Sequence, residues 1–223
     1  MSLRQQDMAY LLDPVMAHHF LGDGHWLNAP IYRVLMSLIR KRPRDLVKLC
    51  TLAAQDAFKN GQIVINTTNW KNIFEQYSQG RLQDTTNEFR SELPDIERLL
   101  LSMKPNKKER TARQGYSYTT DELQKKIKNI EQQGQFFFYG GHLAKPRELI
   151  NFMYKIGFLT ARKGEGGEDG TIIRKYFEEN KYLASDMVEF GFDWEIHPAY
   201  RWALQPDDPR SIYKELKLTA DDK

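Results

Sequence analysis

Hydrophobic residues recur at a spacing of three to four along most of the first 156 residues, and this period predicts helices. The clearest helix begins at Pro43, because proline's missing N–H costs nothing in a first helical turn, and Gly61 is typical of the residue that ends a helix. The same spacing predicts further helices over residues 5–20, 30–40, 68–92, 94–103, 119–133 and 145–156, and Pro14 is expected to kink or divide the first of them.

Two of these helices carry capping residues at their starts. Thr67 or Thr68 is expected to cap the long helix that runs towards Glu92, because a threonine hydroxyl accepts hydrogen bonds from the first free backbone amides. Thr119 with Glu122 matches a capping box, in which each side chain bonds the backbone N–H of the other residue. The sequence therefore predicts where both helices begin.

The pattern changes in the last third of the chain. Residues 158–162 are predicted to form a strand, residues 171–183 a returning strand, and residues 194–196 a third short strand. The glycine-rich stretch 163–170 is read as the hairpin tip, and residues 211–216 as a last short helix. Helix, strand, glycine-rich loop and strand in this order are typical of a winged-helix domain.

The fold class predicted from these elements is mainly α, a helical bundle followed by a winged-helix domain with a small β-hairpin. We place the bundle at 1–103, a basic connector at 104–118 and the winged-helix domain at 119–223. The connector contains no aliphatic residue larger than alanine over 104–116, and this composition is typical of an exposed segment. Its basic residues are a second candidate contact to DNA phosphates, beside those of the hairpin: Lys104, Lys107, Lys108, Arg110 and Arg113.

Composition limits the class of protein. The 223 residues are 40% hydrophobic and 28% charged, which is typical of a folded chain, and the net charge of +3 neither requires nor excludes a nucleic-acid partner. No apolar run approaches the roughly 18–20 residues that span a bilayer, and no secretory signal is present, so we expect a cytoplasmic protein with no membrane partner. The single cysteine, Cys50, excludes an internal disulfide, and its place on an apolar helix stripe predicts a buried, inert thiol.

Enzyme signatures are missing from the sequence. There is no phosphate-binding G-x-x-x-x-G-K-[ST], no H-E-x-x-H and no G-x-S-x-G, so no catalytic residue, metal ligand or cofactor is assigned to this chain. Asp207 and Asp208 followed by Glu215 and Lys217 resemble a fragment of a metal-dependent nuclease. The acids are close together and lie outside any strand pattern, so a solvated charged tail is the preferred interpretation.

Basic residues on the predicted hairpin offer a candidate contact to DNA. Arg162 and Lys163 on one strand, with Arg174 and Lys175 on the other, would release counterions from phosphates and bind DNA independently of base sequence. The alternative is a solvated surface, and the acidic residues at the hairpin tip favour a protein partner. The sequence leaves these alternatives, and the oligomeric state, open.

The segment Arg40-Lys41-Arg42-Pro43-Arg44-Asp45-Leu46 resembles the start of the helical lid in bacterial STAND and AAA+-like P-loop ATPases, most closely those of the Sll1717 type. Phe158-Leu159, the glycine-rich loop and Glu195-Ile196-His197-Pro198-Ala199 are similar to the closing winged-helix part of the same proteins. The resemblance implies that Arg42 and Arg44 sense a nucleotide, with ATP and Mg²⁺ bound by an upstream nucleotide-binding domain. The plainer alternative is that Arg44 and Asp45 start a helix and pair on the surface.

The family's P-loop and Mg²⁺-binding acid have no counterpart in this sequence, so the chain is not expected to be an enzyme by itself. Met1-Ser2-Leu3 resembles a cloning leader, which favours an excised C-terminal region. The hypothesis is a non-catalytic regulatory region of a bacterial P-loop ATPase that contacts a protein partner or duplex DNA. The resemblance implies a role in stress or anti-phage defence. The alternative hypothesis is a stand-alone winged-helix DNA-binding protein.

Overall fold

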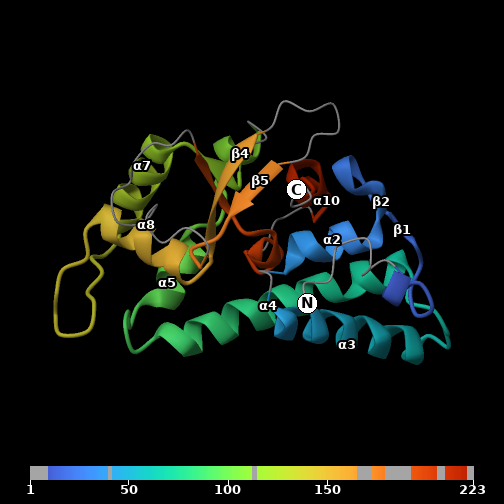
Figure 1. The fold of residues 1–223 in the computed structure, drawn as a ribbon. Helices are drawn as coiled ribbons and strands as arrows, with labels where there is room; N and C mark the ends of the chain where they lie inside the picture. The colour runs from blue at the N-terminus through green and yellow to red at the C-terminus, as the bar shows by residue number, and fades with distance from the viewer. Residues whose placement is uncertain are drawn as a thin grey trace.

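The computed structural model describes residues 10–39, 42–111, 115–164, 172–178, 192–204 and 209–219. The protein is mainly α, as expected, with two small antiparallel sheets where the sequence predicted one small β-hairpin (Figure 1). The α-helices are α2 (Ile31–Leu38), α3 (Pro43–Lys59), α4 (Thr67–Phe89), α5 (Ile96–Ser102), α6 (Lys107–Thr111), α7 (Thr120–Glu131), α8 (Pro146–Lys155) and α10 (Pro209–Glu215). The strands are β1 (His19–Leu21), β2 (Leu27–Pro30), β3 (Ser117–Tyr118), β4 (Leu159–Gly164), β5 (Ile172–Lys175) and β6 (Asp193–Ile196), with 3₁₀ turns η1 (Gly24–Trp26) and η2 (Pro198–Tyr200).

The helix predicted over residues 5–20 stops before Pro14, where a turn over residues 13–15 divides the segment. Residues 10–12 are helical, but Phe20 lies in β1, which pairs with β2 as an antiparallel hairpin. The Phe20 ring is fully buried and meets the Trp26 ring edge-on at 5.8 Å between ring centroids. Burial of these two aromatic rings outweighs the weak local preference for helix, because tertiary packing routinely overrides helix propensity.

Helices α3 and α4 lie side by side along one edge of the molecule (Figure 1). The cap of α4 is Asn66 rather than Thr67 or Thr68, since the Asn66 side chain accepts hydrogen bonds from the backbone N–H groups of Thr68 and Asn69. The Thr67 hydroxyl instead accepts from the backbone N–H of Leu21. The predicted capping box of α7, formed by Thr119 and Glu122, is confirmed.

The larger sheet has the strand order β3-β6-β4-β5, and every pairing in it is antiparallel. The predicted sequence of a helix, a strand, a returning strand and a third short strand is confirmed by α8, β4, β5 and β6. The described part of the returning strand is shorter than expected. Lys163 and Gly164 of the predicted tip belong to β4, and residues 165–170 of the tip lie outside the described residues. The sequence missed β3, which falls inside the predicted connector and pairs with β6.

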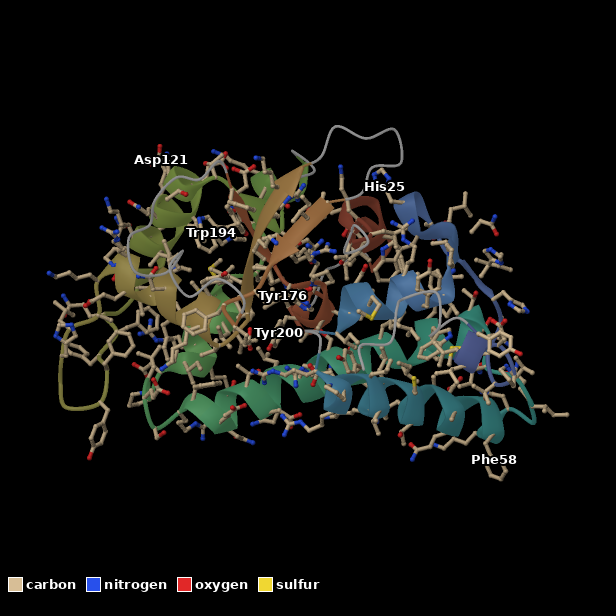
Figure 2. The ribbon with its side chains drawn as sticks, in the orientation of Figure 1. His25, Phe58, Asp121, Tyr176, Trp194 and Tyr200 are labelled. Atoms are coloured by element: carbon tan, nitrogen blue, oxygen red, sulfur yellow. The ribbon has the colours of Figure 1, made fainter. Side chains whose placement is uncertain are left out.

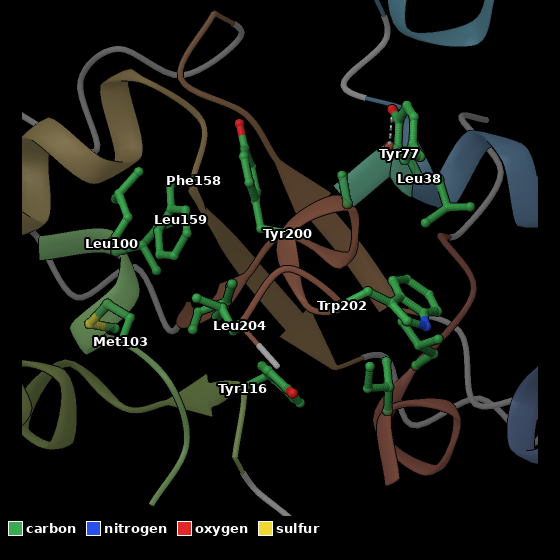
Figure 3. Close-up of a cluster of buried hydrophobic side chains, with 14 of the residues drawn as sticks. Leu38, Tyr77, Leu100, Met103, Tyr116, Phe158, Leu159, Tyr200, Trp202 and Leu204 are labelled. Carbon is green, nitrogen blue, oxygen red and sulfur yellow. Dashed lines mark hydrogen bonds between the residues drawn. The ribbon is translucent and has the colours of Figure 1, made fainter. Parts of the chain in front are cut away.

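One hydrophobic core extends across the predicted boundary at 104–118. The rings of Phe74 on α4 and Trp202 lie 4.8 Å apart between centroids, and Tyr213 on α10 stacks on Phe20. Figure 3 shows side chains of both halves in one buried cluster, with Leu100 of the helical half beside Phe158 and Leu159 of the C-terminal half. The predicted boundary therefore does not divide the hydrophobic core.

Segments of the predicted connector are folded as well. Residues 107–111 form α6, and the aromatic side chains of Tyr116 and Tyr118 are buried. Among the helices of the described residues, none is long and apolar enough to cross a membrane.

Candidate functional site

The start of α3 carries both arginines that the sequence singled out. Arg42 is the residue before the first helical turn, and its Nη2 donates to Oε1 of Glu178 at 3.0 Å. This ion pair is exposed, and such pairs contribute about 0–1 kcal/mol to stability. Arg44 is exposed, and no hydrogen bond or ion pair holds its guanidinium among the residues that the structure describes.

Asp45, the neighbour of Arg44, points inward. Its Oδ1 lies 2.9 Å from Nη1 of Arg81 on α4, and both side chains are almost fully buried. Burial alone would lower the pKa of Arg81, but Tyr200 and Asp45 reverse this effect and raise it, which keeps the guanidinium charged. The surface pairing of Asp45 with Arg44 that the sequence allowed is therefore not what forms: Asp45 instead fastens α3 to α4.

Arg44 and the buried pair line an open pocket of about 440 Å³ between α3 and α4. Three cationic side chains in the lining balance three anionic ones, and Lys48 is already paired with Asp84 at 2.8 Å. Gly80 on α4 makes this pairing sterically easy, because a Cβ there would lie 3.2 Å from the Lys48 ammonium. The pocket as a whole carries no excess charge to attract an ion.

Two of the four candidate DNA-binding residues serve a buried ion cluster. Glu195 on β6 is fully buried and accepts hydrogen bonds from Nε of Arg174 and from Nη2 of Arg201, the latter at 2.8 Å. Arg162 lies 3.8 Å from the same carboxylate and donates to the Ser117 hydroxyl at 2.6 Å. Arg174 is 3% exposed, so its guanidinium is not presented to a ligand at the surface.

The Arg174 side chain also holds the C-terminal segment against the sheet. Its Nη1 donates to the Thr219 hydroxyl at 2.6 Å and its Nη2 to the backbone oxygen of Lys217 at 3.1 Å. The backbone N–H of Thr219 in turn donates to the hydroxyl of Ser37 on α2. The cluster thus links the sheet, the C-terminal segment and the helical half.

Lys163 and Lys175 occupy the other face of the hairpin. Arg162 pairs directly with Arg174 in the register of β4 and β5, and the lysine that follows each arginine points to the opposite side. Lys163 is exposed and Lys175 is half-buried. The two-residue period of a strand places these lysines on the face opposite to the arginines. The sequence prediction grouped all four residues as one contact and so overlooked this period.

The remaining sequence candidates have structural roles or lie outside the described residues. Glu215 accepts a hydrogen bond from the backbone N–H of Tyr116 at 3.2 Å, whereas Asp207 and Asp208 are outside the described residues. No group of three His, Cys, Asp or Glu side chains within the described ranges is placed to hold a metal ion. Cys50 is half-buried, and burial raises the pKa of its thiol to about 11.

The basic connector contributes lysines to a second pocket, of about 590 Å³, that lies between α6 and α7. Lys104 and Lys108 from the connector face Lys125 and Lys126 of α7 across it. The Arg110 side chain and Arg113 lie outside the described residues. The connector lysines were predicted as candidate contacts from the sequence, whereas the two lysines of α7 were not.

Comparison with known proteins gives one informative similarity. No family model matches the chain, and no solved structure matches it. The chain is 26% identical over 191 residues to the putative transposon gamma-delta 80.3 kDa protein of Escherichia coli (strain K12). The match covers 79% of this chain and 25% of that protein, so the chain spans about a quarter of the length of this relative.

Proposed function

We propose that this chain is a non-catalytic regulatory and interaction region of a bacterial P-loop ATPase, in which α3 faces the nucleotide-binding domain. The observation that carries the proposal is the environment of Arg44. Its guanidinium is exposed and unpaired within the described residues, and the Asp45–Arg81 ion pair holds its helix against α4. ATP and Mg²⁺ would be held by the upstream domain and not by this chain.

The geometry of α3 suits a residue that reports on a bound phosphate. The first turn of a helix carries partial positive charge, and an arginine there adds a fork of donors that matches phosphate oxygens. The buried Asp45–Arg81 pair joins α3 to α4, so a movement of Arg44 would carry the helix pair with it. Arg42 is the lesser candidate, because Glu178 already neutralises its charge.

The outer face of α3 supports contact with another domain. Val47 and Phe58 are 64% and 84% exposed and lie eleven residues apart, which places them on the same side of the helix. Phe58 points away from the molecule at the edge of the α3–α4 pair (Figure 2). Similarity to a quarter of an 80.3 kDa protein also supports a region that works within a larger protein.

The C-terminal half would be the partner-contacting module. The order α7, α8, β4 and β5 supports its assignment as a winged-helix domain, with β6 and β3 extending the sheet beyond β4. The module would meet a protein partner or DNA and pass the nucleotide state on to it through the shared core.

The test is ATP turnover by the complete ATPase that carries this chain. We expect Arg44→Ala to lower turnover at least about tenfold, equivalent to about 1.4 kcal/mol of lost transition-state stabilisation, with an unchanged circular dichroism spectrum. Arg90→Ala is the matched control, since Arg90 is an exposed helix-end arginine whose one ion pair within the described residues is with Glu97. Turnover that is unchanged by Arg44→Ala would overturn the role given to Arg44.

Duplex DNA is the second candidate function, favoured by Lys163 and Lys175 on one face of the hairpin and by the relative's description as a transposon protein. Neutralising both lysines should weaken duplex binding and flatten its salt dependence, whereas Lys59→Ala on α3 should not. Arg162 and Arg174 are unsuitable for this test because their removal disturbs the buried cluster. An absence of duplex binding at low salt would argue against this function.

A further inference from the structure

The pocket between α6 and α7, here called the lysine pocket, is lined by Lys104, Lys108, Lys125 and Lys126. The short strand β3 contributes Ser117 and Tyr118 to the lining. Its volume of about 590 Å³ falls within the range of roughly 300–1,000 Å³ that is usual for ligand sites. The space is larger than a single inorganic phosphate needs.

The lining has two more lysines than carboxylates, and both carboxylates are already engaged. Glu109 accepts from the backbone N–H of Asn106 at 2.7 Å and from the Lys126 ammonium at 2.7 Å. Glu122 accepts from the backbone N–H and the hydroxyl of Thr119 in the α7 capping box. The acids therefore leave the pocket with uncompensated positive charge.

Lys108 and Lys125 hold that charge at the surface of the pocket. Both are exposed, and neither makes a hydrogen bond or ion pair among the residues that the structure describes. They come from different elements, α6 and α7, and line the same space. Two ammonium groups so placed would reach an anion in the pocket from two elements.

Lys126 is the deeper cation. Its side chain is 11% exposed, and its ammonium contacts Glu109 Oε2, the backbone oxygen of Lys104 at 3.2 Å and the face of the Tyr118 ring. These contacts hold the ammonium at the lining of the pocket, where its charge acts on a bound anion. Burial lowers the Lys126 pKa, while Glu109 acts to raise it, and an added anion would act in the same direction as Glu109.

Ser117 adds a neutral hydrogen-bond donor to the lining of the lysine pocket. Its oxygen accepts the hydrogen bond from Arg162, so the hydroxyl proton remains available to a group in the pocket. Arg162 is itself held near Glu195, and the buried ion cluster therefore positions this hydroxyl. The pocket between α3 and α4 offers no such excess of donors and charge, because its cations and anions balance.

We propose that the lysine pocket binds a nucleotide phosphate group, either in a free nucleotide or in the backbone of a nucleic acid. A phosphate presents several acceptor oxygens, and lysine ammonium groups bind it as point charges from several directions. The proposal does not depend on the role given to Arg44 or on the hairpin lysines, since it rests on residues of the connector, α7 and β3.

The test measures binding of three probes by the full 223-residue chain at roughly 50 mM salt: a DNA duplex of about 20 base pairs, ATP without metal, and inorganic phosphate. The variant is Lys108→Ala with Lys125→Ala, because both side chains are exposed and their loss should leave the thermal unfolding temperature unchanged. Lys128→Ala is the control, since Lys128 is exposed on α7 but does not line the pocket.

We expect the double variant to weaken binding at least about tenfold, and Lys128→Ala to change it less than about twofold. If the duplex is the bound probe, the double variant should also reduce the slope of log affinity against log salt by about two, or one for each lysine. Binding of the duplex without ATP identifies backbone phosphates as the ligand, and binding of ATP without the duplex identifies a free nucleotide. Failure of all three probes to bind, or an equal loss in the Lys128→Ala control, would overturn the proposal.

Discussion

At the scale of single residues, the buried Glu195 carboxylate pairs with two buried arginines, Arg174 and Arg201. Burial alone would raise the pKa of Glu195, but the charges of Arg174, Arg201 and Arg162 outweigh burial and lower it. A carboxyl group whose pKa is lowered by folding stabilises the folded state above its unfolded pKa of about 4.3. That stability is lost as the pH falls through the lower folded value.

Glu195→Gln keeps the shape of the side chain but leaves the buried Arg174 and Arg201 without a counter-charge. We expect a loss of about 3–5 kcal/mol in the free energy of unfolding at pH 7, measured in urea, and a weaker acid dependence of stability below about pH 4.3. Glu97→Gln, which removes an exposed partner of Arg90, should cost less than about 1 kcal/mol. Equal losses in the two variants would contradict the role assigned to the cluster.

Cys50 gives a prediction that needs no substitution. Because burial raises the pKa of its thiol to about 11, almost none of it is thiolate at pH 8, and the thiolate is the form that reacts. The native protein should therefore react slowly with a thiol-specific reagent and rapidly once it is unfolded in urea. Equal reaction rates in the two states would contradict both the burial of the Cys50 thiol and the rise in its pKa.

At the scale of elements, the start of α4 differs from the sequence prediction, because Asn66 caps the helix where Thr67 or Thr68 was expected. Asn66→Ala removes the side chain that accepts from two backbone amides and should reduce the free energy of unfolding by about 1 kcal/mol. Thr68→Ala, at the exposed position that the sequence also favoured, should change it by less than about 0.5 kcal/mol. Both losses are measured by urea unfolding. A larger loss for Thr68→Ala than for Asn66→Ala would contradict Asn66 as the cap and favour the threonine.

Helices with a clear apolar stripe were the most predictable elements. Pro43 and Gly61 predicted the two ends of α3, and Thr119 with Glu122 predicted the start of α7. The strands β1 and β3 were missed because two or three residues are too few to show a period. Each forms only because a partner, β2 or β6, supplies its backbone hydrogen bonds.

At the scale of the whole molecule, the shared core predicts one unfolding transition. Trp202 from the C-terminal half packs on Phe74 and Trp26 from the helical half, so neither half completes its core alone. Unfolding in urea should give coincident curves by circular dichroism and by tryptophan fluorescence. Trp202→Ala should shift both curves together, with a loss of about 3–5 kcal/mol.

Two resolved transitions would contradict a shared core and support independent folding of 1–103 and 119–223. The exposed aromatic Phe58 provides a matched comparison, since Phe58→Ala removes a large ring that is 84% exposed. That variant should lie within about 0.5 kcal/mol of the parent in free energy of unfolding.

The sequence by itself determined the mainly α class, the positions of α3, α7 and α8, and the strand pair after α8, because these features follow from local periodicity and capping. It also identified Arg44 and the connector lysines as candidate contacts. The tertiary structure alone decided that Arg174 is buried against Glu195, that Asp45 turns to Arg81, and that Lys126 joins Lys108 around one pocket. The sequence pattern does not distinguish a charged residue that water solvates from one that pairs with a residue distant in the chain. Only the packing of separate elements brings such a partner within reach.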